Sequence, residues 1–295
     1  TDEYMYGTDN KSVSGATGAV RLLLAMFLLG AFSTLAQVIF LREMLVVFYG
    51  NELVIGTILT GWFTGICLGA FSARIISSRV WFVLRIDVLL AVSLFVMAVL
   101  LPLQVYVVKI ARHILNVPTG EYASFGSILL SSSLIFLPTC FGTGFIFPFA
   151  CDMISQAREN GKPDAALSVS RIYAWESLGS MLGGITLTFL LLPLLSSFRI
   201  VLIAVGCASL AAAIVSSERK LRYLPALVCV CAFLVIPLYP RLIDNIEKNM
   251  LLAQWRSFGA LSIGEDTGGS PTTHLMAARN SIYQNLVITE SGGQF

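Results

Sequence analysis

Seven long apolar stretches constrain what this chain can fold into. They lie at about Val20–Leu41, Leu53–Ile75, Val80–Val108, Phe125–Cys151, Ile172–Leu195, Ile200–Val215 and Tyr223–Tyr239. A helix needs roughly 20 apolar residues to cross the hydrocarbon of a bilayer. Only 12% of the residues are charged, whereas soluble domains carry roughly a quarter. The sequence therefore predicts an all-α polytopic membrane protein with about seven transmembrane helices in contact with the lipid bilayer.

Polar segments flank this predicted bundle of residues 20–239. Residues 1–19 form a polar N-terminal segment, and the first helix can continue to Phe48. Residues 240–280 contain an amphipathic helix and a linker, because apolar side chains recur at helical spacing between Arg241 and Trp255. We expect this helix to lie on the membrane surface with Trp255 at the interface. The alternative is that it packs back onto the bundle.

Residues 281–295 are typical of the start of a β-rich domain. The segment runs into Gly292 and Gly293, so it is predicted to be the first strand of a β-hairpin. One strand cannot pair its own backbone groups. We therefore expect either a protein partner or a missing soluble domain at this C-terminal tail.

The distribution of Lys and Arg predicts the orientation of the bundle. The N-terminal segment and the second, fourth and sixth connections are richer in these residues than the opposite side. This predicts a multi-pass protein of a bacterial-type inner membrane, with a cytoplasmic N-terminus and a periplasmic tail. The formal net charge of +2 is too small to suggest a nucleic-acid partner.

Two glycine-rich helices are candidates for close packing. Gly61, Gly65 and Gly69 share one helical face, and Gly179 and Gly183 do the same in the fifth span. Small residues let backbones touch in lipid, where the hydrophobic effect does not drive helix association. Each motif lies on the second helix of a three-helix group, which indicates an inverted three-helix repeat. Glycine-rich composition alone is the alternative explanation.

Polar residues within or near the spans are candidates for function. A carboxylate at membrane depth is costly, and it is usually functional or paired. Glu176 could form a structural pair with Arg42 or Arg171, or it could be part of a functional site. The full set of candidates is Gln37, Arg42, Glu43, Asp87, Arg171 and Glu176.

Cysteine and histidine give no metal site. The six cysteines lie in or at the ends of the apolar spans, and their spacing does not fit zinc. His113 and His274 lie outside the predicted spans, so they cannot hold a haem within the bundle. We therefore expect neither a metal nor a cofactor in the bundle.

Three segments together resemble a known family. The runs 31–43, 61–69 and 171–184 are similar to the integral-membrane part of membrane-bound spermidine synthase-like proteins. In that family a helical bundle precedes an aminopropyltransferase domain, and Ser281–Gln284 resembles the opening of that domain. The resemblance implies that Tyr283 and Gln284 contact the donor, decarboxylated S-adenosylmethionine. Glu176 departs from the neutral polar residue expected there.

The sequence lacks counterparts for the rest of the catalytic domain. It has neither the Gly-rich donor loop nor the catalytic Asp that removes a proton from the attacking amine. We do not expect this chain alone to be a complete aminopropyltransferase. The resemblance implies an anchor or scaffold for a soluble domain absent from this chain. The alternatives are a non-enzymatic subunit of a larger membrane complex and a small transporter-like bundle.

Overall fold

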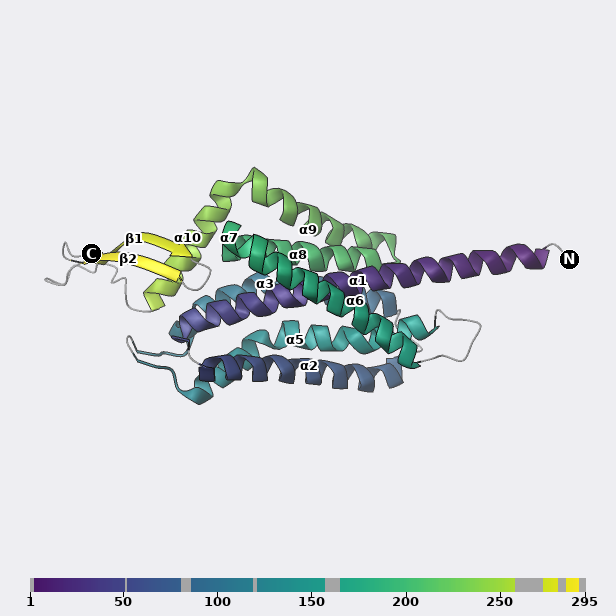
Figure 1. Cartoon of the computed structure of the whole chain (residues 1–295), viewed down its shortest axis with the longest axis horizontal. Coiled ribbons are helices and arrows are strands. Elements are labelled where there is room, and N and C mark those ends of the chain that lie inside the picture. Colours follow the sequence, from purple (N-terminus) through teal and green to yellow (C-terminus); the bar gives the residue numbers. More distant parts are fainter. Residues whose placement is uncertain are drawn as a thin grey trace.

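The computed structural model describes residues 3–50, 52–80, 86–118, 121–156, 165–257, 273–280 and 285–291. Within this part, seven helices are long and apolar enough to cross a membrane, which confirms the predicted all-α membrane fold (Figure 1). The elements are α1 (Glu3–Val47), α2 (Glu52–Val80), α3 (Ile86–Lys109), α4 (Ala111–Ile114), α5 (Phe125–Gln156), α6 (Ala165–Thr186), a π-helical turn (Leu187–Leu191), α7 (Leu192–Leu194), α8 (Ser197–Val215), α9 (Arg219–Leu238), α10 (Pro240–Ser257), β1 (Thr273–Asn280) and β2 (Asn285–Ser291).

Several helix boundaries differ from the predicted spans, and α5, α6 and α9 are each longer at one end than predicted. The polar N-terminal segment is helical, because α1 begins at Glu3 and extends beyond the bundle (Figure 1). Val80 belongs to the end of α2, and α3 begins only at Ile86. The continuation of the first helix toward Phe48 is confirmed, since α1 ends at Val47. It carries Glu43 to the far end of the bundle.

Helix α1 lies at the centre of the bundle and packs against α6, α8, α3 and α5. Its side chains Phe32, Phe40 and Met44 are fully buried. The Phe40 ring stacks on the Phe136 ring of α5 with centroids 4.6 Å apart. Such a helix must be apolar on nearly every side, which explains why its sequence shows no polar stripe.

Glycines bring the helices of two crossings into backbone contact. Where α1 crosses α6, a Cβ atom on Gly30 would overlap the carbonyl oxygen of Glu176, and one on Gly179 would overlap that of Phe27. Where α2 crosses α5, a Cβ on Gly69 would overlap the carbonyl of Phe141. At these positions a side chain larger than hydrogen has no room between the helices.

The α1–α6 and α2–α5 crossings have the same arrangement of glycines and facing carbonyls. In the second crossing, a Cβ on Gly144 would overlap the Ile66 carbonyl. Each glycine therefore faces the carbonyl three positions before the partner glycine, in both helix pairs. If α1, α2 and α3 are matched to α5, α6 and α8, the contact between α1 and α6 corresponds to that between α5 and α2. The contact between α1 and α8 corresponds to that between α5 and α3. This is the pattern that an inverted three-helix repeat produces.

Helix α10 turns back onto the bundle. It begins at Pro240, and proline is well suited to the first turn of a helix. Ile243, Met250 and Gln254 are buried, and α10 contacts α3, α8 and α9. Trp255 is half-buried. The alternative, in which α10 packs back onto the bundle, therefore describes this buried stripe, and the expected position at the membrane surface stays a prediction.

The C-terminal strands form an antiparallel pair. β1 and β2 pair from Thr273 with Ser291 to Asn280 with Asn285, with an irregularity between Leu275 and Ala277. The segment predicted to be a first strand therefore supplies the second strand, β2. Its partner β1 lies at the end of what the sequence indicated as a linker. Tyr283 and Gln284, in the connection, lie outside the described residues.

A substitution at a glycine crossing tests this packing. We expect Gly179→Ala to destabilise the bundle by about 1–3 kcal/mol, because the added methyl group forces α6 away from α1. Thermal unfolding in detergent measures the loss. Gly56→Ala is the matched control, since a Cβ on Gly56 meets nothing within 4 Å. Equal stabilities of the two variants would contradict the packing described here.

Candidate functional site

A buried ion pair connects α1, α3 and α10 at one end of the bundle. The Nζ of Lys109, the last residue of α3, donates a hydrogen bond to Oε2 of Glu43 at 2.6 Å. The same Nζ donates to Oε1 of Gln254 in α10 at 3.3 Å. The Lys109 and Glu43 side chains are only 9% and 3% exposed. Lys109 thus holds α10 against the two helices beneath it.

Further charged groups of α10 face the start of α8. Nη2 of Arg199 donates to Oδ1 of Asp244 at 2.8 Å. Asp244 is 59% exposed, so this pair contributes at most about 1 kcal/mol. We call the seven residues of this region the α10 junction. They are Glu43, Lys109, Ser196, Arg199, Asp244, Glu247 and Gln254.

Glu247 is a half-buried carboxyl of this junction. Burial raises the pKa of its carboxyl, and the charge of Glu43 raises it further. The Ser196 hydroxyl and the charges of Lys109 and Arg199 lower this pKa, but burial outweighs them. Docking of α10 therefore shifts the Glu247 carboxyl toward its protonated form relative to a carboxyl in water.

Arg112 fixes the loop beside this junction. Its side chain is fully buried, and its Nη2 donates to the carbonyls of Pro118 at 3.0 Å and Glu121 at 2.9 Å. The guanidinium also lies over the Tyr49 ring, 4.9 Å from the centroid. These contacts connect the α1–α2 turn to the loop before α5, and they give this end of the bundle a rigid frame.

The polar residues that the sequence analysis named as candidates for function lie apart in the structure. Glu43 pairs with Lys109, which the sequence did not indicate as its partner. Asp87 is buried in the first turn of α3, Arg42 and Gln37 are half-buried on α1, and Arg171 is exposed on α6. They do not converge into one site.

Glu176 is half-buried on the packed face of α6, one turn before Gly179. Its backbone carbonyl faces Gly30 of α1. Among the described residues, no ion pair joins it to Arg42 or Arg171. The predicted structural pair is therefore not formed there, and the functional interpretation of Glu176 stays a prediction.

A buried polar contact between α3 and α5 was missed in the sequence. Nε2 of Gln104 donates to the Ile135 carbonyl at 2.6 Å, and the Thr139 hydroxyl donates to Oε1 of Gln104 at 2.5 Å. The signal was available, since Gln104 is a lone amide within an apolar span. Because both polar ends of the amide are hydrogen-bonded, its burial is compensated.

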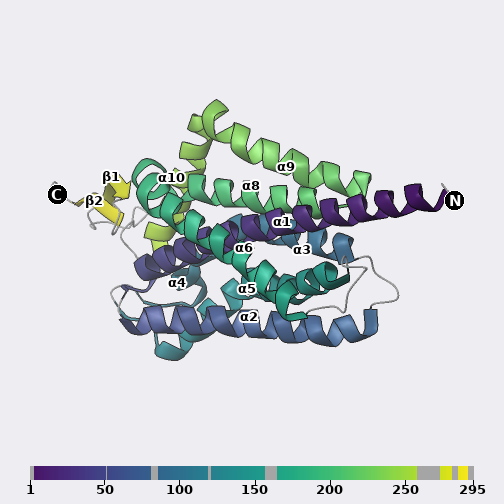
Figure 2. The same ribbon diagram turned by 45° about the vertical axis from the view of Figure 1, so that its right-hand side comes forward.

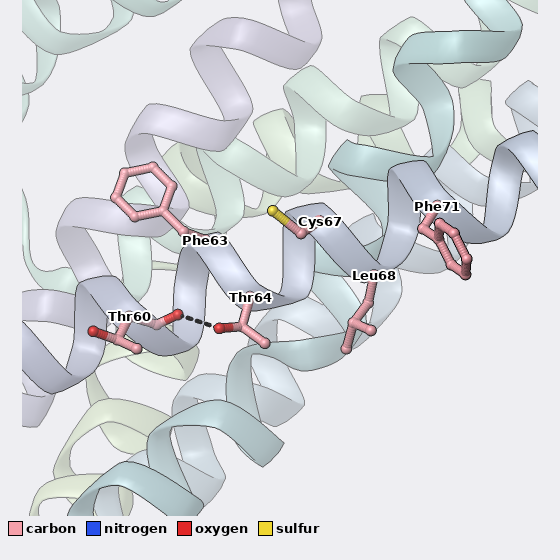
Figure 3. A pocket seen from close by; sticks show the side chains of 6 residues that line it. All are labelled: Thr60, Phe63, Thr64, Cys67, Leu68 and Phe71. Atoms are coloured by element: carbon pink, nitrogen blue, oxygen red, sulfur yellow. Dashed lines mark hydrogen bonds between the residues drawn. The ribbon is translucent and has the colours of Figure 1, made fainter.

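The outer face of α2 carries a shallow groove (Figure 3). All its lining side chains belong to this one helix, and the Thr64 hydroxyl donates to the Thr60 carbonyl at 2.8 Å. Such a hydroxyl is satisfied within the helix and is not directed at a ligand. The lining residues are Thr60, Phe63, Thr64, Cys67, Leu68 and Phe71. The groove therefore fits contact with lipid.

No group of three or more His, Cys, Asp or Glu side chains gathers in a metal-binding arrangement within the described part of the chain. Comparison with protein-family models, with curated proteins and with solved structures finds no match to this chain. The α10 junction is therefore the candidate functional site on geometry alone. The ion pair and hydrogen bonds of the α10 junction hold α10 in one position against the bundle.

Removing one partner of the buried ion pair tests the junction. We expect Lys109→Met to destabilise the protein by about 3–5 kcal/mol, because Glu43 is left buried and uncompensated. Adding Glu43→Leu should recover most of this loss, because no buried charge then remains in the pair. Chemical unfolding of the single and double variants measures the coupling. Additive effects of the two substitutions would contradict a direct pair.

The raised pKa of Glu247 predicts a pH dependence. A carboxyl whose pKa is raised on docking stabilises the docked state below its ordinary value of 4.5 and loses that contribution as pH rises through the raised value. We expect the melting temperature of the parent protein to fall over that window. Glu247→Gln should remove this fall, while Asp244→Asn serves as the exposed control. A parent protein whose stability rises across the window would contradict the assignment.

Proposed function

We propose that this integral membrane protein anchors and orients an extramembrane domain at its C-terminal side. The observation that carries the proposal is the docking of α10. A surface-lying helix leaves whatever follows it free to move, whereas α10 is held through Lys109 to two membrane helices. The β1–β2 pair is the next described element in the chain, and on this proposal the bundle fixes the point at which the chain leaves α10.

The resemblance to membrane-bound spermidine synthase-like proteins gives the extramembrane domain a chemical class. On this proposal it is aminopropyltransferase-like, and it is provided by further sequence or by a partner chain. Tyr283 and Gln284 contribute to the binding of decarboxylated S-adenosylmethionine. The order of elements supports the proposal, because antiparallel strands follow the membrane bundle in the chain, as the resemblance implies.

The protein resides, on this proposal, in a bacterial-type inner membrane with its N-terminus in the cytoplasm. The end at which α1 begins carries more exposed cations than the opposite end, which agrees with the positive-inside rule. The α10 junction and the hairpin then lie on the periplasmic side. A donor made in the cytoplasm would have to reach that side, which makes donor binding the decisive assay.

Donor binding by the protein isolated from its native membrane tests the proposal. We expect retention of decarboxylated S-adenosylmethionine, and about tenfold weaker binding after Gln284→Ala because a hydrogen bond to the donor is lost. Gln294→Ala is the matched control. Intact mass of the same sample shows whether a further domain is present. A sample of larger mass that retains no donor would contradict the aminopropyltransferase-like class.

A transporter-like bundle is the second candidate, and Glu176 is the observation that favours it. Its carboxyl lies on a packed membrane face without an ion-pair partner among the described residues, and intramembrane carboxylates often mark ion or substrate paths. Uptake of polyamine into proteoliposomes that is abolished by Glu176→Gln would favour transport. A structural subunit of a larger complex would show neither uptake nor donor binding.

A further inference from the structure

The two ends of the bundle differ in exposed charge. At the end where α1 enters the bundle, the exposed acid among the described side chains is Glu218, and the exposed cations are Arg21, Arg74, Arg171, Arg219 and Lys220. At the opposite end the exposed cations are Arg241 and Lys248, and the exposed acids are Glu52, Glu121 and Asp244. Among the described side chains, exposed cations therefore outnumber exposed acids at the first end but not at the second.

Most of these cations lie on neighbouring elements. Helix α1, which carries Arg21, packs against both α6 and α8. α6 carries Arg171, and α9 begins at Arg219 directly after the short connection from α8. Figures 1 and 2 both show the start of α9 beside α1. We call the exposed residues Arg21, Arg171, Arg219 and Lys220, which lie at this end of the bundle on α1, α6 and α9, the basic rim.

The α8–α9 connection is held in place at this rim. Nε and Nη2 of Arg222 donate to the carbonyl of Ser216 at 3.2 and 2.7 Å. Arg222 thus closes the turn, and it leaves the exposed Arg219 and Lys220 at the start of α9 directed to the surroundings. The basic side chains at this point are presented by an ordered turn.

The surroundings of the rim match a phospholipid better than a soluble anion. Tyr173 and Tyr223 are 63% and 64% exposed and lie next to the basic residues in the chain, and tyrosines are enriched at the headgroup level of membranes. Exposed apolar side chains follow within the next turns, including Leu24 and Leu224. A lipid with an anionic headgroup matches this order, because its phosphate can contact the cations while its acyl chains contact the apolar side chains.

We propose that the basic rim of Arg21, Arg171, Arg219 and Lys220 binds the headgroup phosphates of anionic phospholipids. Arginine and lysine make charge-assisted hydrogen bonds to phosphate oxygens. Each cation near an anionic membrane surface strengthens binding by about fivefold. The inference is independent of the anchor proposal, because it concerns the opposite end of the bundle from the α10 junction.

Lipid titration of the purified full chain tests this proposal. The protein in nonionic detergent is titrated with phosphatidylglycerol and with phosphatidylcholine, and bound lipid is counted by native mass spectrometry. We expect phosphatidylglycerol to bind more tightly by well over 25-fold, because two of the four cations alone contribute about that much at about fivefold each. The variant Arg219→Gln/Lys220→Gln should lose about 25-fold of that preference if each cation contributes about fivefold. The matched control, Arg241→Gln/Lys248→Gln at the other end, should retain it.

Several outcomes would overturn the proposal. Equal affinity for the two lipids would remove the role of charge. An equal loss in the control variant would show that net charge rather than the rim binds lipid. Displacement of phosphatidylglycerol by inorganic phosphate at equal concentration would show a simple anion site instead of a lipid site. Unfolding temperatures in phosphatidylcholine show whether the exposed substitutions leave the fold intact.

Discussion

Close contact between helix backbones is the interaction on which the rest of this structure depends. Lipid surrounds the bundle, so burial of apolar side chains does not by itself hold the helices together. Glycine removes the side chain that would keep two backbones apart, as at Gly30 and Gly179 between α1 and α6. The equivalent contact at Gly69 and Gly144 holds α2 against α5. Two similar crossings thus build the bundle around α1.

Polar interactions have a different role, because they lie mainly where the bundle meets its extramembrane parts. Lys109 is buried at the end of α3 and contacts both Glu43 and Gln254. A buried pair of this kind adds little net stability compared with apolar packing, but it is costly to break. It therefore selects one position for α10. The membrane helices supply rigidity, and the junction extends it to α10.

The sequence predicted the spans well because span length and apolar composition are local properties. It could not choose between a surface-lying and a docked α10, since Ile243 and Met250 form the same apolar stripe in both cases. Gln254 on that stripe was the available signal for docking. The Glu43–Lys109 pair joins residues far apart in the chain, so only the fold reveals it. β1 was missed because its residues, such as His274 and Arg279, do not alternate as a clear strand.

Hydrogen exchange of the backbone amides of α10 in lipid nanodiscs tests the central claim most directly. A helix docked through buried Ile243 and Gln254 should exchange slowly, and replacing Lys109 by Met should speed its exchange while α8 stays protected. This result would show that the bundle holds α10 in a fixed position. Fast exchange throughout Pro240–Ser257 in the parent protein, with protected membrane helices, would contradict the account and return α10 to the membrane surface.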